Sequence, residues 1–363
     1  MKLALFISSL GSGGAERVIS DLANHWTQCG HDVHLITFAS RDEIPFYPLD
    51  EKITIHPLNL LGETLSIFKR FINIINRLII IRQTVRFLKP DRILSFVDIT
   101  NITVLMATLG LKIPVIVSER SDPHFHRIPS LYSTVRLYLY RFAKNIVVQT
   151  KSAQSFFAYQ NNIRIIPNTA SCPQYMATYR ESLAIIVSVG RLIKSKDFSL
   201  LIRSFANIVA AFPRSRLTIY GEGPERANLE RLIRQLKLEN RVFLPGAVKN
   251  IQEKLAEADL FIFPSRYEGF PNALCEAMAV GLPVIASNCT GNIDVVEDGF
   301  NGLLFPIGDE EALINHIKIL CDDAGLREKL GKKAMEISRT YSPEKIYRLW
   351  DETVIKLTEF NKF

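Results

Sequence analysis

The sequence predicts an α/β protein built from two tandem domains, each with a parallel sheet covered by helices on both faces. The chain has 363 residues, more than one ordinary hydrophobic core organises. Short apolar runs alternate with longer helical stretches, a pattern typical of strands that are buried on both faces. The alternation gives way after residue 167 to a stretch rich in Pro, Asn, Ser and Thr, and begins again at residue 183.

The first domain opens on an apolar run that resembles the core of a signal peptide. A glycine-rich turn and a polar helix follow it, where a cleavage site would need small residues. We therefore interpret this run as the first buried strand. The strands expected in this domain are Leu3–Ser8, Asp32–Phe38, Arg92–Phe96, Val115–Ser118, Asn145–Gln149 and Ile163–Ile166, with a helix at Ala15–Thr27.

The second domain repeats the pattern. Its expected strands are Leu183–Val189, Arg216–Tyr220, Val242–Leu244, Leu260–Phe263 and Pro283–Ser287. Its expected helices are Ser199–Ala211, Asn250–Ala258, Asn272–Val280, Glu310–Cys321 and Gly325–Tyr341. The predicted organisation is a first domain over 1–170, a linker over 171–182, a second domain over 183–342 and a last helix within 343–363, from Pro343 to about Glu359.

Composition narrows the class of protein. Apolar residues make up 47% of the chain, too many for a disordered protein. The five cysteines are odd in number and form no Cys-x-x-Cys pair, which disfavours a disulfide framework or a zinc site and predicts a reducing cytoplasm. The net charge of +7 predicts an anionic partner: phosphate, nucleic acid or membrane. No apolar window is long enough to span a bilayer.

Two doubly wound, Rossmann-like domains in tandem are expected to bind ligands where the carboxyl ends of both sheets face one crevice. The first strand-to-helix loop there carries Gly13 and Gly14, whose backbone can approach an anion at a helix N-terminus. Glu16 replaces the third glycine of the dinucleotide motif, and the second strand is followed directly by Ala39-Ser40-Arg41 and by no convincing acidic residue. NAD binding is therefore disfavoured, and anion binding and a structural turn both remain open.

The corresponding loop of the second domain carries two cations. Arg191 and Lys196 follow the first strand of that domain. A guanidinium offers a planar fork for two phosphate oxygens and an ammonium offers a mobile point charge. The pair predicts neutralisation of a diphosphate leaving group, with a solvated basic loop as the alternative.

The loop over 263–278 is the most specific. Glu268 precedes a predicted helix and Glu276 lies one turn inside it, so both carboxylates can converge at the helix N-terminus. Such carboxylates accept hydrogen bonds from sugar hydroxyls. Gly269 allows close backbone approach. Pro271 lacks an N–H, so the free donors expected here are the amides of Phe270, Asn272 and Ala273.

Three motifs together resemble glycosyltransferase family four, whose members have the GT-B fold. They are Gly-Gly-Ala-Glu-Arg from Gly13, Gly-Arg-Leu-x-x-x-Lys from Gly190, and Glu-Gly-Phe-Pro-Asn-x-x-x-Glu from Glu268. The resemblance implies a retaining, metal-independent transferase that needs no cofactor beyond its nucleotide-sugar donor, with UDP as the expected nucleotide. The chain also contains no Asp-x-Asp motif to hold a divalent metal.

The resemblance also implies roles for single residues. Catalytic roles fall on Glu268, Arg191, Lys196 and Arg120, the last standing where many family members have a histidine. The last helix would return to brace the first domain. The donor would contact Gly13, Gly14, Gly246, Gly269, Phe270, Pro271, Asn272, Ala273 and Glu276, with Glu276 on the ribose and Gly246 in the segment beside the base.

A basic amphipathic helix is expected over 66–89. Lys69, Arg70 and Arg77 share one side of it, and Phe68, Phe71, Ile72, Ile75 and Leu78 share the other. Such a helix can lie in a membrane interface and attract anionic head groups. A core-packed helix with a solvated basic face is the alternative.

Within the family, this region resembles bacterial transferases that extend undecaprenyl-diphosphate-linked oligosaccharides with N-acetylgalactosamine. That implies a UDP donor, a lipid-linked acceptor, peripheral contact at the inner face of the membrane and no nucleic acid. A UDP-sugar epimerase and a basic nucleic-acid-binding protein are the alternatives, the latter disfavoured because the loops lack interleaved aromatic platforms. The acceptor-binding candidates are Arg77, Arg82, Arg86, Lys89, Asp98, Asn101 and His124.

Overall fold

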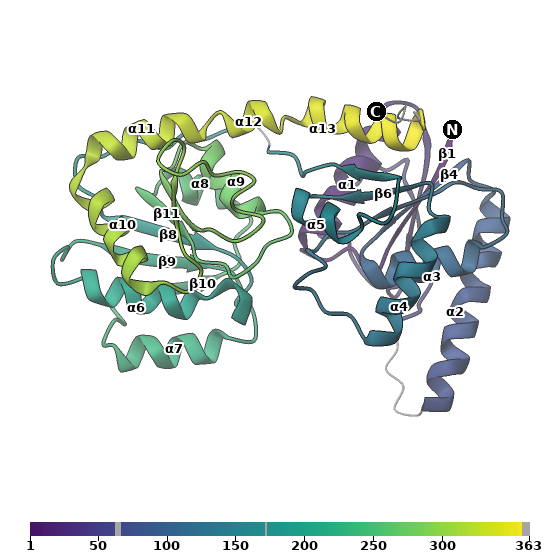
Figure 1. Cartoon of the computed structure of the whole chain (residues 1–363), viewed down its shortest axis with the longest axis horizontal. Helices are drawn as coiled ribbons and strands as arrows, with labels where there is room; N and C mark the ends of the chain where they lie inside the picture. The colour runs from purple at the N-terminus through teal and green to yellow at the C-terminus, as the bar shows by residue number, and fades with distance from the viewer. Residues whose placement is uncertain (62–66, 171–172, 358–363) are drawn as a thin grey trace. The chain divides into compact units, whose positions relative to one another are not determined.

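The computed structural model describes residues 1–61, 67–170 and 173–357, with only the backbone over 67–71. The chain divides into two compact units (Figure 1). Unit 1 is Met1–Pro167 together with the residues from Ile346 onward, and unit 2 is Asn168–Lys345. The predicted linker residues 171–172 and the predicted helix beyond residue 357 lie outside the described residues.

Unit 1 contains a fully parallel seven-stranded sheet in the order β3-β2-β1-β4-β5-β6-β7. The buried apolar strands were expected, but β3 was not, because it is exposed or half-buried throughout and so lacks a buried apolar run. The strands are β1 (Lys2–Ile7), β2 (Asp32–Thr37), β3 (Thr54–Pro57), β4 (Arg92–Phe96), β5 (Val115–Ser118), β6 (Asn145–Val148) and β7 (Ile163–Ile165).

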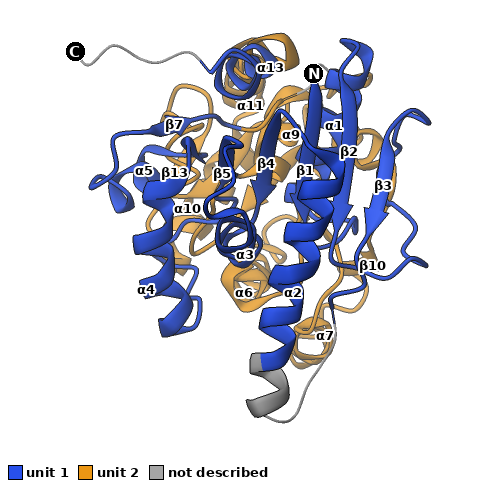
Figure 2. Cartoon of the chain, turned by 90° about the vertical axis from the view of Figure 1, so that its right-hand side faces the viewer, with its two compact units in different colours: residues 1–167, 346–363 blue, residues 168–345 orange. Residues whose placement is uncertain are grey.

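Three helices cover one face of this sheet: α2 (Ile67–Leu88), α3 (Asp98–Thr108) and α4 (Ser130–Leu139) (Figure 2). Ile81 and Val85 of α2 are fully buried against the strands. The remaining helices of unit 1 are α1 (Gly14–Gln28), which follows β1, and the short α5 (Lys151–Phe156).

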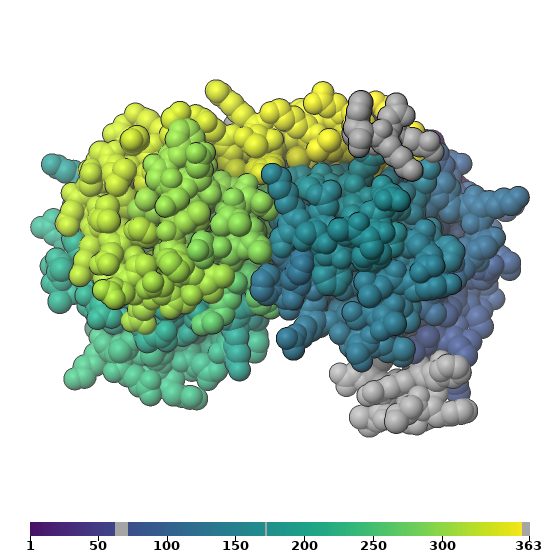
Figure 3. Space-filling view, viewed as in Figure 1, coloured from purple at the N-terminus to yellow at the C-terminus, as the bar shows by residue number. Residues whose placement is uncertain are grey.

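The end of the described chain completes the core of unit 1. Helix α13 (Pro343–Trp350) continues as a π-helical turn over Asp351–Ile355. The Trp350 ring is fully buried and stacks on Phe96 with 5.8 Å between ring centroids. Trp26 of α1 donates from Nε1 to Asp351 Oδ1 at 2.8 Å. In Figure 3 the yellow end of the chain lies against teal residues of unit 1. The Asn145 side-chain amide, in β6, donates to the Thr353 carbonyl at 3.2 Å.

Unit 2 contains a parallel six-stranded sheet in the order β10-β9-β8-β11-β12-β13. Its strands are β8 (Ile185–Val189), β9 (Arg216–Tyr220), β10 (Val242–Gly246), β11 (Leu260–Phe263), β12 (Val284–Ser287) and β13 (Leu303–Phe305). One core contains α6 (Phe198–Ile208), α7 (Arg226–Gln235) and α10 (Glu310–Asp322). The other contains α8 (Ile251–Ala256), α9 (Asn272–Ala279) and α12 (Ile337–Thr340), with the end of α11 (Ala324–Ala334).

The single helix expected over 325–341 is interrupted between α11 and α12. The amides of Glu336 and Ser338 donate three residues back, to the carbonyls of Lys333 and Met335. This tighter 3₁₀-type pattern breaks the regular α-helical ladder without reversing the chain.

Both sheets share the strand order 3-2-1-4-5-6 that is common to dinucleotide-binding folds, so the predicted pair of Rossmann-like halves is confirmed. The order reverses between β1 and β4 in unit 1 and between β8 and β11 in unit 2. Ligands of such sheets bind outside the carboxyl ends of the strands at this reversal. A ligand-binding site is therefore expected in the loops after these four strands.

Two further features bear on the sequence expectations. Among the described helices, none combines the length and the apolarity needed to cross a membrane. The four described cysteines, Cys29, Cys275, Cys289 and Cys321, are free thiols. Cys172 lies outside the described residues.

Candidate active site

An ion pair lies at the reversal point of unit 2. Lys196, from the loop after β8, lies with its Nζ 2.5 Å from Oε1 of Glu268, from the loop after β11. Both side chains are mostly buried, with 17% and 11% of their surface exposed. The ammonium also lies 4.6 Å from the centroid of the Phe263 ring. The structure thus brings together two predicted catalytic residues that are 72 positions apart in the sequence.

The turn after β9 fixes the loop that carries Arg191. Gly221 and Gly223 have φ of +144° and +159°, and a Cβ at either would overlap the backbone of Gly190 or Leu192. The Leu192 amide donates to the Glu222 carbonyl at 2.9 Å. Only glycine tolerates both this backbone conformation and this close approach. Arg191 is exposed, and the described residues provide no ion-pair partner for its guanidinium, which leaves it available to an anionic ligand.

A second ion pair was missed by the sequence analysis. Asp197 has φ of +48° and is buried, and its carboxylate pairs with Arg266 NH2 at 2.7 Å. The Arg266 amide also donates to the Ser195 carbonyl at 2.8 Å. These contacts join the loop after β8 to the loop after β11, so they hold Lys196 and Glu268 in register. The sequence offers one signal for this geometry, the aspartate in the loop, because Asp tolerates the left-handed conformation better than most residues.

The N-terminus of α9 differs from the expectation of three free amide donors. The Asn272 amide donates to the Phe270 carbonyl at 3.0 Å. Pro271 has φ −86° and ψ 71°, which are the angles of an inverse γ-turn, and this turn occupies the Asn272 donor. No backbone carbonyl in the described part of the chain accepts from the amides of Ala273 or Leu274. The amide of Phe270 likewise donates to no backbone carbonyl in that part of the chain, so Phe270 and Ala273 remain donor candidates and Leu274 joins them.

The other donor-side candidates surround this helix start. Glu276 lies in the second turn of α9, as expected, and is half-buried. The loop after β12 supports Glu268 from behind, because a Cβ at Gly291 would lie 2.7 Å from Glu268 Cβ. Gly246, with φ +93°, ends β10 and accepts from the Gly221 amide at 2.9 Å. Among the described residues, no three His, Cys, Asp or Glu side chains are placed to hold a metal ion.

The first loop of unit 1 contains its own anion. Gly13 is the N-cap of α1, and a Cβ there would overlap the carboxylate of Glu16. The carboxylate therefore lies over the positive end of the helix dipole, where a phosphate would otherwise be stabilised. The predicted approach of Gly13 and Gly14 to donor phosphates stays a prediction, and it requires Glu16 to move aside.

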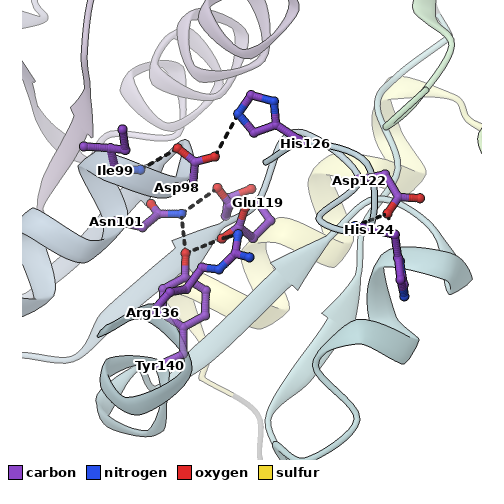
Figure 4. A network of polar contacts seen from close by, with 10 residues as sticks. Asp98, Ile99, Asn101, Glu119, Asp122, His124, His126, Arg136 and Tyr140 are labelled. Atoms are coloured by element: carbon purple, nitrogen blue, oxygen red, sulfur yellow. Dashed lines mark hydrogen bonds and ion pairs between the residues drawn. The ribbon is translucent and has the colours of Figure 1, made fainter. Parts of the chain in front are cut away.

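The loop after β4 is strained. Val97 has φ of +72°, which is a rare conformation for a β-branched residue and costs on the order of 1–3 kcal/mol. It places Asp98 at the start of α3, where Oδ1 accepts from the Ile99 amide at 2.6 Å and Oδ2 lies 3.2 Å from His126 Nε2 (Figure 4). Burial would raise the pKa of Asp98, but these contacts lower it overall. The same hydrogen bond raises the pKa of His126. Acceptor contact stays a prediction for Asp98, and the pairing of Asp98 with His126 was not expected from the sequence.

Arg120 lies in the next loop along the sheet, after β5. Its guanidinium lies 5.0 Å from the centroid of the Phe96 ring, whose other neighbour is Trp350. Burial lowers the pKa of Arg120 to about 9, which still leaves it cationic at neutral pH. Arg120 thus places a positive charge at the position where many family members have a histidine.

A buried polar network lies beneath this loop (Figure 4). The Tyr140 hydroxyl donates to Glu119 Oε1, and Arg136 NH1 lies 3.6 Å from the same oxygen. Asn101 donates to the Ser118 carbonyl at 2.9 Å and to Tyr140. Asn101 has no exposed surface, so in this structure it stabilises the end of β5 and does not reach an acceptor as predicted.

Stability should depend on pH through Glu119. Burial raises its pKa to about 7, against an ordinary value of 4.5, with Arg136 opposing the shift. The folded protein therefore holds a proton that the unfolded chain releases between these pH values, so the free energy of unfolding falls as pH rises from 4.5 to about 7. In Glu119→Gln, urea unfolding at successive pH values should show a shallower fall than in the native protein.

Exposed Glu239→Gln is the matched control for Glu119→Gln and should reproduce the native pH profile. His126, with its raised pKa, contributes in the same direction in both proteins. A variant at Glu119 that loses stability as steeply as the native protein would contradict the assignment.

His124 belongs to a separate pair in the same loop. Its Nδ1 lies 3.0 Å from Oδ1 of Asp122, and Ser152 donates to Oδ2 of that carboxylate at 2.9 Å. Asp122 is buried, whereas the His124 side chain is 40% exposed. The buried carboxylate orients an accessible imidazole, so contact with an acceptor stays a prediction for His124.

The arginines of α2 are divided between the protein and solvent. Arg77 donates to the Leu60 carbonyl at 2.7 Å, so its side chain does not form part of an outward basic face as expected. Arg82 donates to the carbonyls of Ala107 and Leu109 at 2.8 and 2.9 Å, closing the end of α3. Arg86 is exposed. Acceptor contact stays a prediction for all three; the side chains of Lys69 and Arg70 lie outside the described residues.

Two family models match the chain. Residues 12–171 match the model described as Glycosyltransferase Family 4, and residues 178–337 match Glycosyl transferases group 1. A Campylobacter jejuni N-acetylgalactosamine-N,N'-diacetylbacillosaminyl-diphospho-undecaprenol 4-alpha-N-acetylgalactosaminyltransferase is 30% identical over 363 residues, which cover 96% of this chain and 97% of the relative. The amylovoran biosynthesis glycosyltransferase AmsD of Erwinia amylovora is 25% identical, with 97% and 99% covered.

Solved structures match the fold over nearly the whole chain. Sucrose-phosphate synthase from Thermosynechococcus elongatus aligns with a TM-score of 0.85 at 19% identity, covering 97% of this chain and 98% of the other. Anabaena HepE in complex with UDP aligns with a TM-score of 0.79 at 20% identity, with 97% and 99% covered. The fold is therefore that of the GT-B glycosyltransferases. The chain belongs to glycosyltransferase family four, and it is a glycosyltransferase, which removes the epimerase and nucleic-acid-binding alternatives.

Proposed function

We propose that this glycosyltransferase moves an N-acetylhexosamine, with N-acetylgalactosamine as the first candidate, from a UDP-sugar to a lipid-linked glycan. The reaction retains the anomeric configuration, needs no metal, and takes place at the cytoplasmic face of the bacterial membrane, in surface glycan synthesis. The observation that carries the proposal is the Lys196–Glu268 pair at the reversal point of the unit 2 sheet, with Arg191 exposed in the same loop after β8 as Lys196.

The donor side follows from the charges at this point. The leaving diphosphate gains negative charge as the glycosidic bond breaks, and Lys196 and Arg191 neutralise that charge. The amides of Ala273 and Leu274 add hydrogen-bond donors at the positive end of α9. Glu268 orients Lys196 and accepts a sugar hydroxyl with its second oxygen, while Glu276 accepts from the ribose.

The nature of the acceptor is supported by two relatives. The 30% identical Campylobacter jejuni protein acts, by its name, on a diphospho-undecaprenol glycan with N-acetylgalactosamine. A second protein from that species, 26% identical over 361 residues, is named as an alpha-1,4-N-acetyl-D-galactosaminyltransferase for a PP-undecaprenol glycan. Both names describe a sugar acceptor attached to a lipid diphosphate, an anion that suits a protein of net charge +7.

Contact with the membrane surface is supported by the outer face of α2. Ile72, Ile75 and Ile79, which share one face of the helix, are each between 40% and 47% exposed, and Phe87 is 83% exposed. An exposed apolar row beside basic side chains favours insertion among anionic head groups. The helix thus offers the acceptor's lipid an apolar surface on unit 1 itself.

The function is tested by incubating the purified protein with UDP-N-acetylgalactosamine, UDP-N-acetylglucosamine, UDP-galactose and UDP-glucose in the presence of a polyprenyl-diphosphate-linked glycan. We expect one donor to be consumed with transfer to the acceptor and the anomeric configuration retained, as read by NMR of the product. Failure to transfer any of these sugars, or an inverted product, would contradict the proposal.

Activity should survive EDTA. The side chains of Lys196 and Arg191 supply the positive charge that a divalent metal would otherwise bring to the diphosphate. We expect the same turnover number with EDTA as with added magnesium or manganese. A rate that collapses in EDTA and recovers with either metal would mean that the diphosphate is neutralised differently.

Charge reversal on α2 should weaken membrane binding. Each Lys or Arg near an anionic surface contributes about 1 kcal/mol, so removing the two cations of Lys69 and Arg70 alone weakens binding to phosphatidylglycerol vesicles roughly thirtyfold at low salt. The repulsion of the two introduced glutamates should make the loss in Lys69→Glu with Arg70→Glu larger than that. Arg77 is left intact because it bonds the Leu60 carbonyl. Vesicle co-sedimentation measures the binding, and donor hydrolysis should be unchanged because the proposed donor residues lie in unit 2.

The matched control places the same charge change on α7 of unit 2, at the exposed Arg231 and Arg234. We expect this Arg231→Glu, Arg234→Glu variant to co-sediment like the native protein. Equal losses in the two variants would reduce the effect to net charge, and no loss in the α2 variant would make α2 a core helix only.

A further inference from the structure

The chain passes between the two units twice. Both passages contact residues 264–272, the loop after β11 together with the first residue of α9, which we call the donor loop. Asn168 is the first residue of unit 2, and Tyr341 lies four residues before its last, Lys345. The Ala170 amide donates to the Tyr341 carbonyl at 2.8 Å, which joins the two passages to each other. The contacts described below all lie within unit 2.

The first passage holds the start of α9. Asn168 is buried, with 4% of its surface exposed, and its Nδ2 donates to Asn272 Oδ1 at 2.6 Å. Asn272 is the first residue of α9. A buried amide gains net stability from such a bond and loses it when the partner is removed. The bond therefore fixes both the Asn272 side chain and the direction in which the helix begins.

The second passage holds the residue before the γ-turn. The Tyr341 and Phe270 rings meet edge to face, with 5.5 Å between centroids and 85° between planes. The Tyr341 hydroxyl donates to the Asp294 carbonyl at 3.2 Å, beyond the usual O–H···O range, so the ring contact is the main restraint. Phe270 is itself buried. Tyr341 thus limits how far the backbone of the donor loop can move.

The donor loop needs such outside support because α9 lacks the usual internal one. Its N-cap residue is Pro271, which provides no side-chain hydrogen bond to the first turn. In the γ-turn at Pro271 the Asn272 amide already donates to the Phe270 carbonyl, so it is not free for a ligand. The directions of the remaining donors, the backbone amides of Ala273 and Leu274, depend on the conformation of the loop and on the direction of the helix axis. Side chains from elsewhere must therefore set that direction.

We propose that Asn168 and Tyr341 are positioning residues of the donor site, which hold the first amides of α9 on the donor's diphosphate and sugar through Asn272 and Phe270. This proposal rests on the proposed function, because it assumes that a nucleotide sugar binds at α9. Neither residue touches the donor. Their effect is on where the donor-binding amides lie.

The test is a double-mutant cycle on the Michaelis constant for UDP-N-acetylgalactosamine. We expect Asn168→Ala to raise the donor KM about tenfold, Asn272→Ala to do the same, and the double variant to exceed neither by more than about twofold, since both remove one interaction. The KM for the lipid-linked acceptor should stay within about twofold of the native value. Independent effects that multiply to about a hundredfold would overturn the proposal.

Conservative and matched variants separate positioning from folding. Tyr341→Phe keeps the ring contact with Phe270 and should keep the native donor KM, whereas Tyr341→Ala should raise it like Asn168→Ala. Asn162→Ala removes a bond of equal length, from Asn162 Nδ2 to the Ala143 carbonyl at 2.6 Å in unit 1, and should leave donor KM unchanged. A rise in donor KM in Asn162→Ala equal to that in Asn168→Ala would overturn the proposal.

Calorimetry with UDP gives a readout without turnover. We expect Asn168→Ala to bind UDP about tenfold more weakly than the native protein does, and Tyr341→Phe to bind it as the native protein does. UDP binding and turnover in the native protein, with both unchanged in Asn168→Ala, would overturn the positioning role alone. A native protein that neither binds UDP nor consumes a UDP-sugar would overturn the proposed function and this inference with it.

Discussion

Replacing Lys196 by Ala is expected to lower the turnover number about a hundredfold. Removing one preorganised contact to charge that develops in the transition state typically costs on the order of 3 kcal/mol. Lys196 is well placed for this role because Glu268, 2.5 Å away, and the Phe263 ring fix its ammonium at the reversal point of the sheet. Arg191→Ala should depress turnover to a similar degree, since its exposed guanidinium belongs to the same loop after β8 and is expected to bind the same diphosphate.

Two comparisons keep the effect at Lys196 specific. Lys194→Ala removes an exposed lysine two positions away in the same loop and should retain native turnover. Lys196→Ala also leaves the mostly buried Glu268 without its cation, so the double variant with Glu268→Gln shows whether lost stability contributes. Steady-state kinetics on folded protein, checked by circular dichroism, supply the measurement. Near-native turnover in both Lys196→Ala and Arg191→Ala would refute their assignment to the diphosphate.

Replacing Trp350 by Ala is expected to destabilise unit 1 by about 3–5 kcal/mol, the usual range for deleting a fully buried tryptophan ring. The ring has no exposed surface and stacks on Phe96, which in turn carries the Arg120 guanidinium on its ring. The substitution should therefore also lower turnover by loosening Arg120. Denaturant unfolding and steady-state kinetics on the same preparation measure the two effects.

Leu349→Ala is the control for Trp350→Ala. Leu349 is the preceding residue on the same helix and is 37% exposed, so its truncation should cost less than about 1 kcal/mol and leave turnover unchanged. If Trp350→Ala is no more destabilising than Leu349→Ala, the C-terminal segment does not belong to the core of unit 1 as described.

The sequence predicts the parallel sheets because their strands are continuous apolar runs. Leu3 to Ile7 and Leu260 to Phe263 are almost completely buried, as such runs require. Topology then locates the loops of the site, since parallel strands bring their carboxyl ends to one edge. Lys196 and Glu268 were therefore expected at the same edge of the sheet before their contact was known, whereas their catalytic roles stay predictions.

What the sequence could not predict are partners that depend on three-dimensional register. Asp197 and Arg266 are 69 positions apart, and His126 meets Asp98 only because Val97 adopts a left-handed conformation that its β-branched side chain disfavours. Asn101 shows the converse: a polar residue near the loop edge suggested binding, but its amide closes the end of β5. Similarly, Arg77 and Arg82 bond backbone carbonyls, which no pattern of charges along α2 indicates.

The assignment of Ile346 and the residues after it to unit 1 has a consequence for synthesis on the ribosome. Domains usually fold in order as the chain emerges, the N-terminal one first. Here the first 167 residues lack Trp350 and Val354, both fully buried in the finished core, and the Asp351 acceptor of Trp26. Unit 2 is complete as soon as Lys345 has been made. The second unit is therefore the first that can reach its final form, and the nascent first unit must wait with part of its apolar surface uncovered.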